Sequence, residues 1–312
     1  MAFSEQGSIW MSGRLVPWKD ATIHVATHAL HYGTGIFEGM RAYATPEGTA
    51  VYRLPEHMRR LYDSCRVYRM DLPWPVEELT SAVLDTVRAN GFRSCYIRPL
   101  VYRGVESLGL DPRPCPVEAA IVVWEWSAMF GAEGLEQGID VGVSSWSRLA
   151  PNTLPAMAKA TANYANSALI KMQASLDGYG EAIALDEAGL VSEGSGQNLF
   201  LVRDRVIYTP SIGSSILQGI TRDSVLVLAR ELGFEVRETP TPREMLYLAD
   251  EAFFCGTAVE VTPIRSIDRI PVGGGARGPV TSAIQSRFFD ILHGKVPDTH
   301  GWLTRVPVPE SR

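Results

Sequence analysis

Residues 155–167 read PAMAKATANYANS and place a single lysine, Lys159, in an alanine-rich run, with Tyr164 five positions later. Lysines usually lie on solvated helix faces beside acidic partners, but no acidic residue lies within four positions of Lys159. A lysine must lose its proton before it can attack a carbonyl group, and surroundings without acids favour the neutral amine. The stretch alone leaves the role of Lys159 open between a reactive amine and a structural lysine.

The composition of the chain is typical of a water-soluble globular protein. It has 312 residues, of which 46% are hydrophobic and 21% charged, and its net charge is −6. This length predicts two domains or one large α/β unit. The negative charge argues against nucleic acid as a partner. The longest apolar run, Ala119 to Trp124, is too short to span a membrane.

The cysteines and the N-terminal residues give an expectation about the compartment. The four cysteines lie at least twenty residues apart and show no CxxC spacing, which favours neither a disulfide framework nor a thiolate zinc site. The stretch MAFSEQGSIWMSG lacks a basic region followed by an apolar one, so we expect no signal peptide. We therefore predict a cytoplasmic protein.

The pattern of the first half predicts strands and two helices. Apolar or alternating runs predict strands at 8–18, 21–33, 49–55, 95–104 and 118–126, and helical spacing predicts helices at 55–69 and 76–89. A glycine-containing segment then interrupts the strand pattern. We place the domain limits there, with a small domain at 1–128, an interdomain loop at 129–136 and a large domain at 137–312.

The second half has longer helices between groups of short strands. Helices are predicted at about 163–176, 221–233 and 281–294, and strands at 139–146, 180–210 and 249–268. No regular strand–helix–strand repeat is visible. The fold class is therefore α+β with mostly antiparallel strands.

Several short motifs have weak chemical meaning by themselves. The glycine pairs at 33–39, 178–180 and 194–196 neither follow a strand nor open a helix, as a dinucleotide-binding motif requires. His24, His28 and His31 cluster, but their surroundings predict extended or irregular chain, and no carboxylate lies at ligand spacing. We expect hydrogen-bonding histidines and no metal.

A phosphate site is indicated where Gly219, Ile220 and Thr221 precede an amphipathic helix whose buried face carries Val225, Leu228, Ala229 and Leu232. Free amides at a helix start bind anions, although Thr221 could merely cap the helix. Arg59 and the Gly-Thr turn at 256–257 are weaker candidates. Glu193, before a Gly-rich turn, is either an exposed turn residue or a carboxylate aimed at a cationic ring nitrogen.

Taken in chain order, these pieces resemble the branched-chain-amino-acid aminotransferases, which use pyridoxal 5′-phosphate (PLP) on the fold called type IV. The resemblance spans nearly the whole chain and rests on several long motifs in the right order. These motifs are HALHYGTGIFEGMRAY, YIRPLVYRG, SSWSRLAPNTLPAMAKATANY, EAIALDEAGLVSEGSGQNLF, ILQGITRD and LADEAFFCGTAVEVTPI. The resemblance implies a larger C-terminal domain built on a barrel-like antiparallel sheet with flanking helices.

The resemblance also implies a role for each candidate residue. Lys159 matches the lysine that binds PLP covalently and moves the proton of the substrate. Glu193 would pair with the pyridine nitrogen and Tyr164 with the phenolic oxygen, while Leu217 would pack against the ring. The phosphate would be held by Arg59, Ile220, Thr221 and Thr257.

The substrate pocket implied by the resemblance must accept both an apolar side chain and that of glutamate. It comprises Tyr32, Phe37, Tyr96, Arg98, Leu108, Trp126 and Ala258. One position departs from the family pattern, because Met129 stands where many bacterial members carry a tyrosine. Methionine offers no hydrogen-bond donor, so we expect weaker use of glutamate and 2-oxoglutarate.

The sequence thus predicts reversible transamination of leucine, isoleucine and valine with 2-oxoglutarate. PLP would lie between the domains, and a homodimer or dimer-based hexamer is expected by analogy. The alternatives are a D-amino-acid aminotransferase, an (R)-amine transaminase or an aminodeoxychorismate lyase of the same fold. A non-catalytic metabolite-binding protein or a histidine-based metal-dependent hydrolase would belong to other classes.

Overall fold

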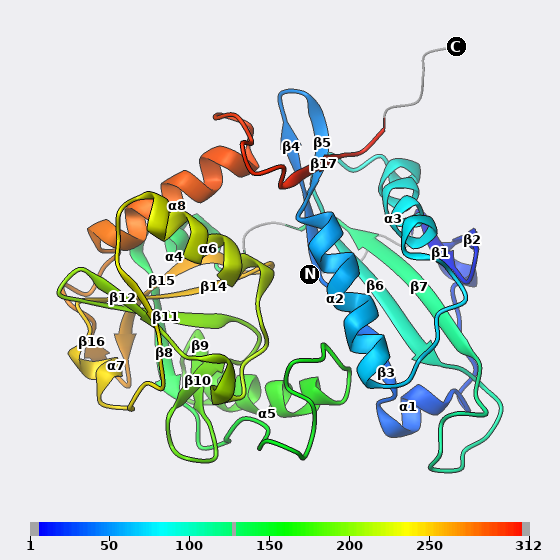
Figure 1. Ribbon diagram of the computed structural model, residues 1–312, viewed down its shortest axis with the longest axis horizontal. Helices are drawn as coiled ribbons and strands as arrows, with labels where there is room; N and C mark the ends of the chain where they lie inside the picture. Colours follow the sequence, from blue (N-terminus) through cyan, green and yellow to red (C-terminus); the bar gives the residue numbers. More distant parts are fainter. Residues whose placement is uncertain (1–5, 127–128, 308–312) are drawn as a thin grey trace. The chain divides into compact units, whose positions relative to one another are not determined.

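The computed structural model describes residues 6–126 and 129–307. Contacts divide the chain into two compact units (Figure 1). The first unit contains the chain up to Trp126, the short segment Ala158–Ala162 and the residues from Ile291 onward. The second contains Ser127–Met157 and Asn163–Asp290. Each unit therefore combines separated stretches, and Lys159 belongs to the first; the predicted domain limits stay a prediction.

The first unit is built on an antiparallel sheet with strand order β17-β5-β4-β6-β7-β1-β2, to which β3 adds by pairing with β6. Its strands are β1 (Ser8–Met11), β2 (Arg14–Pro17), β3 (Gly35–Phe37), β4 (Met40–Thr45), β5 (Gly48–Tyr52), β6 (Cys95–Arg103), β7 (Val117–Trp124) and β17 (Leu303–Arg305). Its helices are η1 (Trp18–Asp20), α1 (His28–Tyr32), α2 (Leu54–Val67) and α3 (Val76–Asn90).

Helices α2 and α3 pack on this sheet and on each other. Met58, Leu61 and Cys65 recur at helical spacing on α2 and are fully buried. α3 starts after Pro75 and ends at Gly91, whose φ of +68° suits the left-handed cap. Both predicted helices are confirmed within two residues at each end.

The predicted strand at 21–33 is wrong. Its last five residues before Gly33 form the one-turn helix α1, and Gly33 ends that helix with a φ of +65°. Alternating apolar residues in a half-buried strand should lie on a covered face, but Ile23 and Val25 are both exposed in this unit. The apolar pattern of this segment therefore does not report pairing in a sheet.

The second unit contains a nine-stranded sheet with the order β10-β9-β8-β15-β14-β11-β12-β13, and β16 pairs with β15. The pairs β8–β9, β8–β15 and β12–β13 are parallel, and the others are antiparallel. The strands are β8 (Ile139–Val143), β9 (Glu181–Leu185), β10 (Val191–Gly194), β11 (Asn198–Arg203), β12 (Val206–Thr209), β13 (Val236–Glu238), β14 (Glu251–Gly256), β15 (Glu260–Ile267) and β16 (Ile270–Pro271).

The helices of the second unit are α4 (Gly131–Gln137), α5 (Asn163–Leu176), η2 (Ile212–Ser214), α6 (Ile220–Glu231), α7 (Met245–Leu248) and α8 (Pro279–Leu292). The predicted α+β class is confirmed, although the segment expected as an interdomain loop holds helix α4. On α6, Val225, Leu228 and Ala229 are buried as predicted, whereas Leu232 follows the last turn and is exposed. Across residues 6–126 and 129–307, none of the helices has the length and apolar composition that a membrane span needs.

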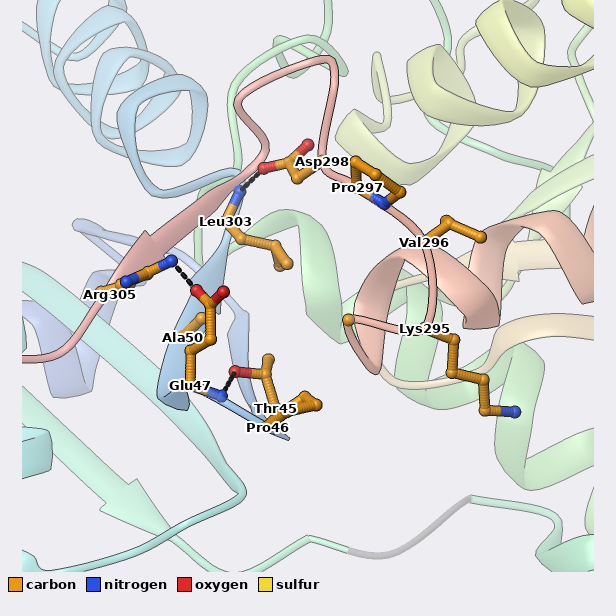
Figure 2. Close-up of a pocket in the computed structure, with 11 residues that line it drawn as sticks. Thr45, Pro46, Glu47, Ala50, Lys295, Val296, Pro297, Asp298, Leu303 and Arg305 are labelled. Carbon is orange, nitrogen blue, oxygen red and sulfur yellow. Dashed lines mark hydrogen bonds and ion pairs between the residues drawn. The ribbon is translucent and has the colours of Figure 1, made fainter.

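The end of the chain returns to the first unit. Strand β17 pairs antiparallel with β5, and Arg305 forms an ion pair with Glu47 in the turn of the β4–β5 hairpin. The segment between α8 and β17 borders a surface pocket, where the Asp298 carboxylate accepts a hydrogen bond from the Leu303 amide (Figure 2). None of the predicted site residues lines this pocket.

Candidate functional site

Lys159 is fixed by hydrogen bonds of its own backbone and of its neighbours. Its amide donates to the Ser64 hydroxyl at 3.1 Å, and its carbonyl accepts from the Phe37 amide at 3.0 Å. The adjacent Ala160 forms an isolated bridge with Ile36 of β3. The segment thus lies along β3 like a short additional strand, which holds the lysine in one place relative to the first unit.

The Lys159 side chain lies over an aromatic ring that it shares with an arginine. Its Nζ atom is 4.9 Å from the centroid of Phe37, and the Arg98 guanidinium lies 4.6 Å from the same centroid. Cation–π attraction of this kind favours a positive charge close to the ring face. The predicted catalytic lysine and two predicted pocket residues, Phe37 and Arg98, therefore lie together within a single unit.

Arg98 is enclosed by more rings than the sequence predicts. Its guanidinium is 5.3 Å from the Tyr96 ring and 5.7 Å from Trp124, and Tyr96 lies 5.0 Å from Trp126. The Arg98 Nε atom is buried and has no hydrogen-bond partner within the described part of the chain. An arginine held by aromatic faces with an unsatisfied donor is equipped to bind a carboxylate.

Two close contacts shape this aromatic cluster. A Cβ at Gly39 would lie 2.0 Å from the Tyr96 hydroxyl, so only glycine lets the ring occupy its position. The Tyr32 hydroxyl donates to the Leu108 carbonyl at 3.0 Å, which brings together two more predicted pocket residues. Both contacts lie in the first unit.

The structure places the two neighbouring arginines of α2 in different surroundings. The Arg59 side chain is 85% exposed and pairs only loosely with Asp63, at 3.9 Å. The Arg60 side chain is 14% exposed, because position 60 lies on the helix side of the buried His57 and Leu61. Arg60 is thus the inward cation of this helix, and the phosphate role expected for Arg59 stays a prediction.

Arg60 binds Glu38, a fully buried carboxylate. The Arg60 Nε atom donates to Oε1 at 2.6 Å and its Nη2 to Oε2 at 2.9 Å, while His57 Nδ1 lies 2.6 Å from Oε2. Burial alone would raise the pKa of Glu38, but the Arg60 charge and the hydrogen bonds from both partners outweigh it and hold the pKa far below its usual range. Burial lowers the pKa of His57 in spite of Glu38. The ring is therefore neutral near pH 7.

Glu193 is the corresponding buried carboxylate of the second unit. It lies on β10 and accepts from Arg148 Nη2 at 2.8 Å and from Asn198 Nδ2 at 2.9 Å. The Leu217 amide lies 3.2 Å from both of its oxygens. The side chains of Glu193 and Arg148 are each only 5% exposed. Glu193 is thus no exposed turn residue; the structure excludes that alternative.

The residue before α6 is a glycine, which leaves room for a neighbouring side chain at the start of the helix. The N-cap is Gly219, which has no side chain to accept the first amides, and Thr221 is the second helical residue and not a cap. A Cβ at Gly219 would lie 1.9 Å from the Asn198 Oδ1 atom. Because Asn198 also contacts Glu193, one amide side chain links the carboxylate to this helix start.

The remaining predicted residues of the second unit occupy loops and helix ends. Thr257 and Ala258 form the turn between β14 and β15, and Tyr164 lies half-buried in the first turn of α5. Met129 is 39% exposed and lies in the turn that leads into α4. Their placement leaves their predicted roles as predictions.

The histidine cluster makes hydrogen bonds. His28 lies 2.8 Å from the Thr34 hydroxyl and 2.9 Å from the Gly109 carbonyl, and His31 lies 2.9 Å from the Val25 carbonyl. No group of three His, Cys, Asp or Glu side chains suited to a metal is present in the described ranges 6–126 and 129–307.

Comparison with known proteins gives a consistent result. Residues 35–267 match the family described as amino-transferase class IV. The branched-chain-amino-acid aminotransferase of Escherichia coli K12 is 50% identical over 299 residues, which cover 96% of this chain and 97% of that protein. This chain belongs to the branched-chain-amino-acid aminotransferase family. The predicted family and enzyme class are confirmed, and the activity is transamination of branched-chain amino acids.

Solved structures of this aminotransferase family have the same fold. A crystal structure of the E. coli enzyme superposes with a TM-score of 0.95 at 50% identity and covers 97% of this chain and 100% of its own. The enzyme of Thermobaculum terrenum in its PLP form gives a TM-score of 0.91 at 37% identity, covering 98% of this chain and 100% of its own. The enzyme of Thermoproteus uzoniensis with norvaline also gives 0.91, at 42% identity, covering 96% of this chain and 99% of its own. The predicted type IV fold is confirmed.

The sequence interpretation did not name several residues that form these buried hydrogen-bonded and aromatic clusters. These are Glu38, His57, Arg60, Trp124, Arg148 and Asn198. Helical spacing from His57 to Arg60 and Ser64 was a usable signal for Arg60. Arg148 and Glu193 are 45 positions apart, and no local pattern connects them.

Proposed function

We propose that this aminotransferase reversibly transfers the amino group of leucine, isoleucine or valine to 2-oxoglutarate, with Lys159 as its catalytic residue. The observation that carries the proposal is the Phe37 ring, which has the Lys159 Nζ atom at 4.9 Å and the Arg98 guanidinium at 4.6 Å. The first group can transfer a proton and the second can bind a carboxylate, so the ring links chemistry to substrate recognition.

The cofactor is PLP. The PLP form of the Thermobaculum terrenum relative supports this assignment, and so do two features of this chain. Glu193 is a buried, multiply hydrogen-bonded carboxylate suited to a protonated ring nitrogen. The N-cap of α6 is Gly219, which has no side chain to accept the first helix amides, and amides at a helix start can bind phosphate. When bound, PLP supplies an electron-accepting ring that makes the α-proton of an amino acid removable.

Each residue then has a defined task. Lys159 would hold the cofactor covalently, and its free amine would take the proton from the substrate α-carbon and return it on the product side. Glu193 keeps a proton on the ring nitrogen, with Tyr164 at the phenolic oxygen and Leu217 against the ring. That these groups serve one cofactor molecule follows from the family resemblance.

For the phosphate we propose Arg60 in preference to Arg59. The Arg60 guanidinium is largely buried, whereas the Arg59 side chain lies in solvent. A charge-assisted hydrogen bond gains strength where water is excluded, which favours the inward arginine. The Ile220 and Thr221 amides, the Thr221 hydroxyl and Thr257 complete the set.

For the substrate we propose that Arg98 and Tyr32 bind the side-chain carboxylate of glutamate. A T.th. relative, 48% identical to this chain, has been solved in complex with N-(5′-phosphopyridoxyl)-L-glutamate, which supports an acidic substrate for that enzyme. Branched side chains would contact aromatic and aliphatic groups, with Met129 as apolar bulk. The proposed pocket residues are Tyr32, Phe37, Tyr96, Arg98, Leu108, Trp126, Met129 and Ala258.

We further propose a cytoplasmic homo-oligomer, either a homodimer or a dimer-based hexamer. All four cysteines are buried free thiols, as a reducing compartment favours. In the first unit Val25, Leu30 and Leu110 are exposed apolar residues around α1 and the loop that contacts it. Apolar groups of this kind fit a subunit interface. Light scattering of the holoenzyme measures the oligomer.

The deciding experiment is an absorption titration of the purified holoenzyme. We expect a visible band that leucine removes and 2-oxoglutarate restores, because the cofactor alternates between its two forms. Lys159→Ala should lose this reversible cycle, whereas Lys171→Ala, a change at a partly exposed lysine of α5, should retain it. A protein that stays colourless with added PLP, and in which Lys159→Ala changes nothing, would contradict the proposal.

A further inference from the structure

The Glu38–Arg60 pair has the geometry of a clamp on the guanidinium group. Glu38 uses both oxygens to bind one edge of Arg60, at 2.6 and 2.9 Å, and is itself held by His57 at 2.6 Å and by the Gly39 amide at 3.1 Å. The Glu38 amide also donates to the Pro99 carbonyl at 2.9 Å. The carboxylate therefore has a fixed position, and the edge of Arg60 that it binds cannot turn to another anion.

Stability alone does not account for such a cluster. A buried ion pair is often no more stabilising than well-packed apolar residues, because both charges lose their hydration. The carboxylate of Glu38 has no exposed surface, whereas the Arg60 side chain keeps 14% of its own. The arrangement therefore fits an arginine that is held on its buried side by Glu38 and that remains partly exposed to a ligand.

The position of Glu38 in the chain connects this clamp to the catalytic lysine. Glu38 directly follows Phe37, whose amide binds the Lys159 carbonyl and whose ring lies against the Lys159 Nζ atom. Ser64, one turn after Arg60 on α2, accepts the Lys159 amide. Two adjacent residues and one helix thus fix both the lysine and the arginine.

We propose that Glu38 is a positioning residue which, with His57 behind it, orients Arg60 to bind the phosphate of the cofactor. This inference rests on the proposed function, in which Arg60 contacts that phosphate. Glu38 acts through Arg60 and touches neither cofactor nor substrate. His57 serves as a neutral donor, since a second positive charge beside Arg60 would compete for the same carboxylate.

The test compares PLP with pyridoxal, which lacks the phosphate, as ligands of the apoenzyme. Glu38→Gln keeps the size of the side chain and removes its charge. We expect the Kd for PLP to rise about 10-fold or more and the Kd for pyridoxal to change less than about 2-fold, because only PLP uses Arg60. Equal weakening of both ligands, or of neither, overturns the inference.

A double variant separates positioning from a general structural role. If Glu38 acts through Arg60, the double variant that carries both Glu38→Gln and Arg60→Gln binds PLP no more weakly than the single variant Arg60→Gln. If the double variant instead raises the Kd for PLP by the product of the two single effects, the inference is overturned. If Glu38→Gln does not fold, His57→Leu replaces it and should weaken PLP selectively, while His57→Asn, which keeps a donor, should restore binding.

The outcomes also distinguish this inference from the proposed function. A wild-type apoenzyme that binds PLP no better than pyridoxal contradicts phosphate binding by Arg60, and the inference falls with it. A preference for PLP that Arg60→Gln abolishes and Glu38→Gln leaves intact supports the proposed function and overturns only the role of Glu38.

Discussion

Each unit of the molecule contains a buried arginine–carboxylate pair, and the two pairs are built in opposite ways. In the first unit Glu38 holds Arg60 along one guanidinium edge, with distances of 2.6 and 2.9 Å. In the second unit Arg148 makes one contact of 2.8 Å with Glu193, whose oxygens are shared with Asn198 and the Leu217 amide. In the first unit the carboxylate of Glu38 therefore fixes a cation. In the second unit several donors fix the carboxylate of Glu193.

We relate this difference to the proposed function, in which Arg60 binds the phosphate and Glu193 pairs with the ring nitrogen. Several donors from separate stretches converge on Glu193, so its orientation is set whichever single contact is lost. Arg60 is oriented by the two hydrogen bonds that it donates to Glu38. A phosphate needs a fixed cation and a protonated ring nitrogen needs a fixed anion, which is the charge that each unit provides.

We expect the largest effect on activity from removing the negative charge of Glu193. Glu193→Gln should lower kcat by on the order of 10³-fold, because the amide cannot stabilise the proton on the ring nitrogen. Steady-state kinetics with leucine and 2-oxoglutarate measure it. Glu187→Gln, in an exposed turn of the same unit, is the matched control and should keep kcat. A kcat within a few-fold of wild type would remove Glu193 from its proposed role.

Removing the partner of Glu193 should act mainly on stability. Arg148→Met leaves a buried carboxylate without its cation and should lower the free energy of unfolding by about 3–5 kcal/mol. The exposed pair Arg265–Asp140 offers a control, because Arg265→Met should cost about 1 kcal/mol or less. Urea denaturation of both variants gives the comparison. Similar losses for the two would show that burial does not distinguish these pairs.

The two neighbouring arginines of α2 give the next effect. Arg60→Gln should raise the Kd for PLP by about 10- to 150-fold, the value of one charge-assisted hydrogen bond. Arg59→Gln should change it less than about 2-fold, since Arg59 is exposed. Equilibrium titration of the apoenzymes measures both. If Arg59→Gln raised the Kd for PLP more than Arg60→Gln does, Arg59 would be the phosphate ligand.

Acid should weaken the first unit through His57. Burial lowers its folded-state pKa below the ordinary value of 6.5, so below pH 6.5 the unfolded chain binds a proton that the folded protein does not. The contribution of His57 to the free energy of unfolding is therefore largest above pH 6.5. Below that pH the group contributes a loss of about 1.4 kcal/mol per unit until the folded-state pKa is reached. Denaturation at several pH values should show a shallower dependence for His57→Asn; an unchanged one contradicts the argument.

The smallest effect concerns the partly exposed Met129. Met129→Tyr should lower the KM for 2-oxoglutarate by roughly 2- to 10-fold through one added hydrogen bond. The KM for leucine should stay nearly constant, because the change adds a donor and not apolar contact. Met172→Tyr on the exposed side of α5 serves as the control. A KM for 2-oxoglutarate that does not change would leave Met129 outside the pocket.

The sequence predicted those parts of the molecule that local periodicity controls. Helices α2, α3, α5, α6 and α8 follow from apolar spacing and from caps such as Gly91. The segment at 21–33 failed because α1 is a single turn closed by Gly33, too short for a periodic signal.

The site was predicted unevenly for the same reason. Lys159 and Glu193 stand out in their local sequence or by resemblance, but the groups that orient them come from distant positions. Glu38 and Arg60 are 22 positions apart on different elements, and Arg148 and Glu193 are 45 apart. Only folding brings such partners together, so charge complementarity between them is invisible to local patterns.

Strand β17 has a consequence for how the protein is made. Its partner β5 ends at Tyr52, so this strand leaves the ribosome about 250 residues before Leu303, with which Tyr52 pairs. During synthesis the edge of β5 is open, and an unpaired strand edge can recruit other chains. Nascent chains stalled before Leu303 should therefore associate with one another more readily than the released protein.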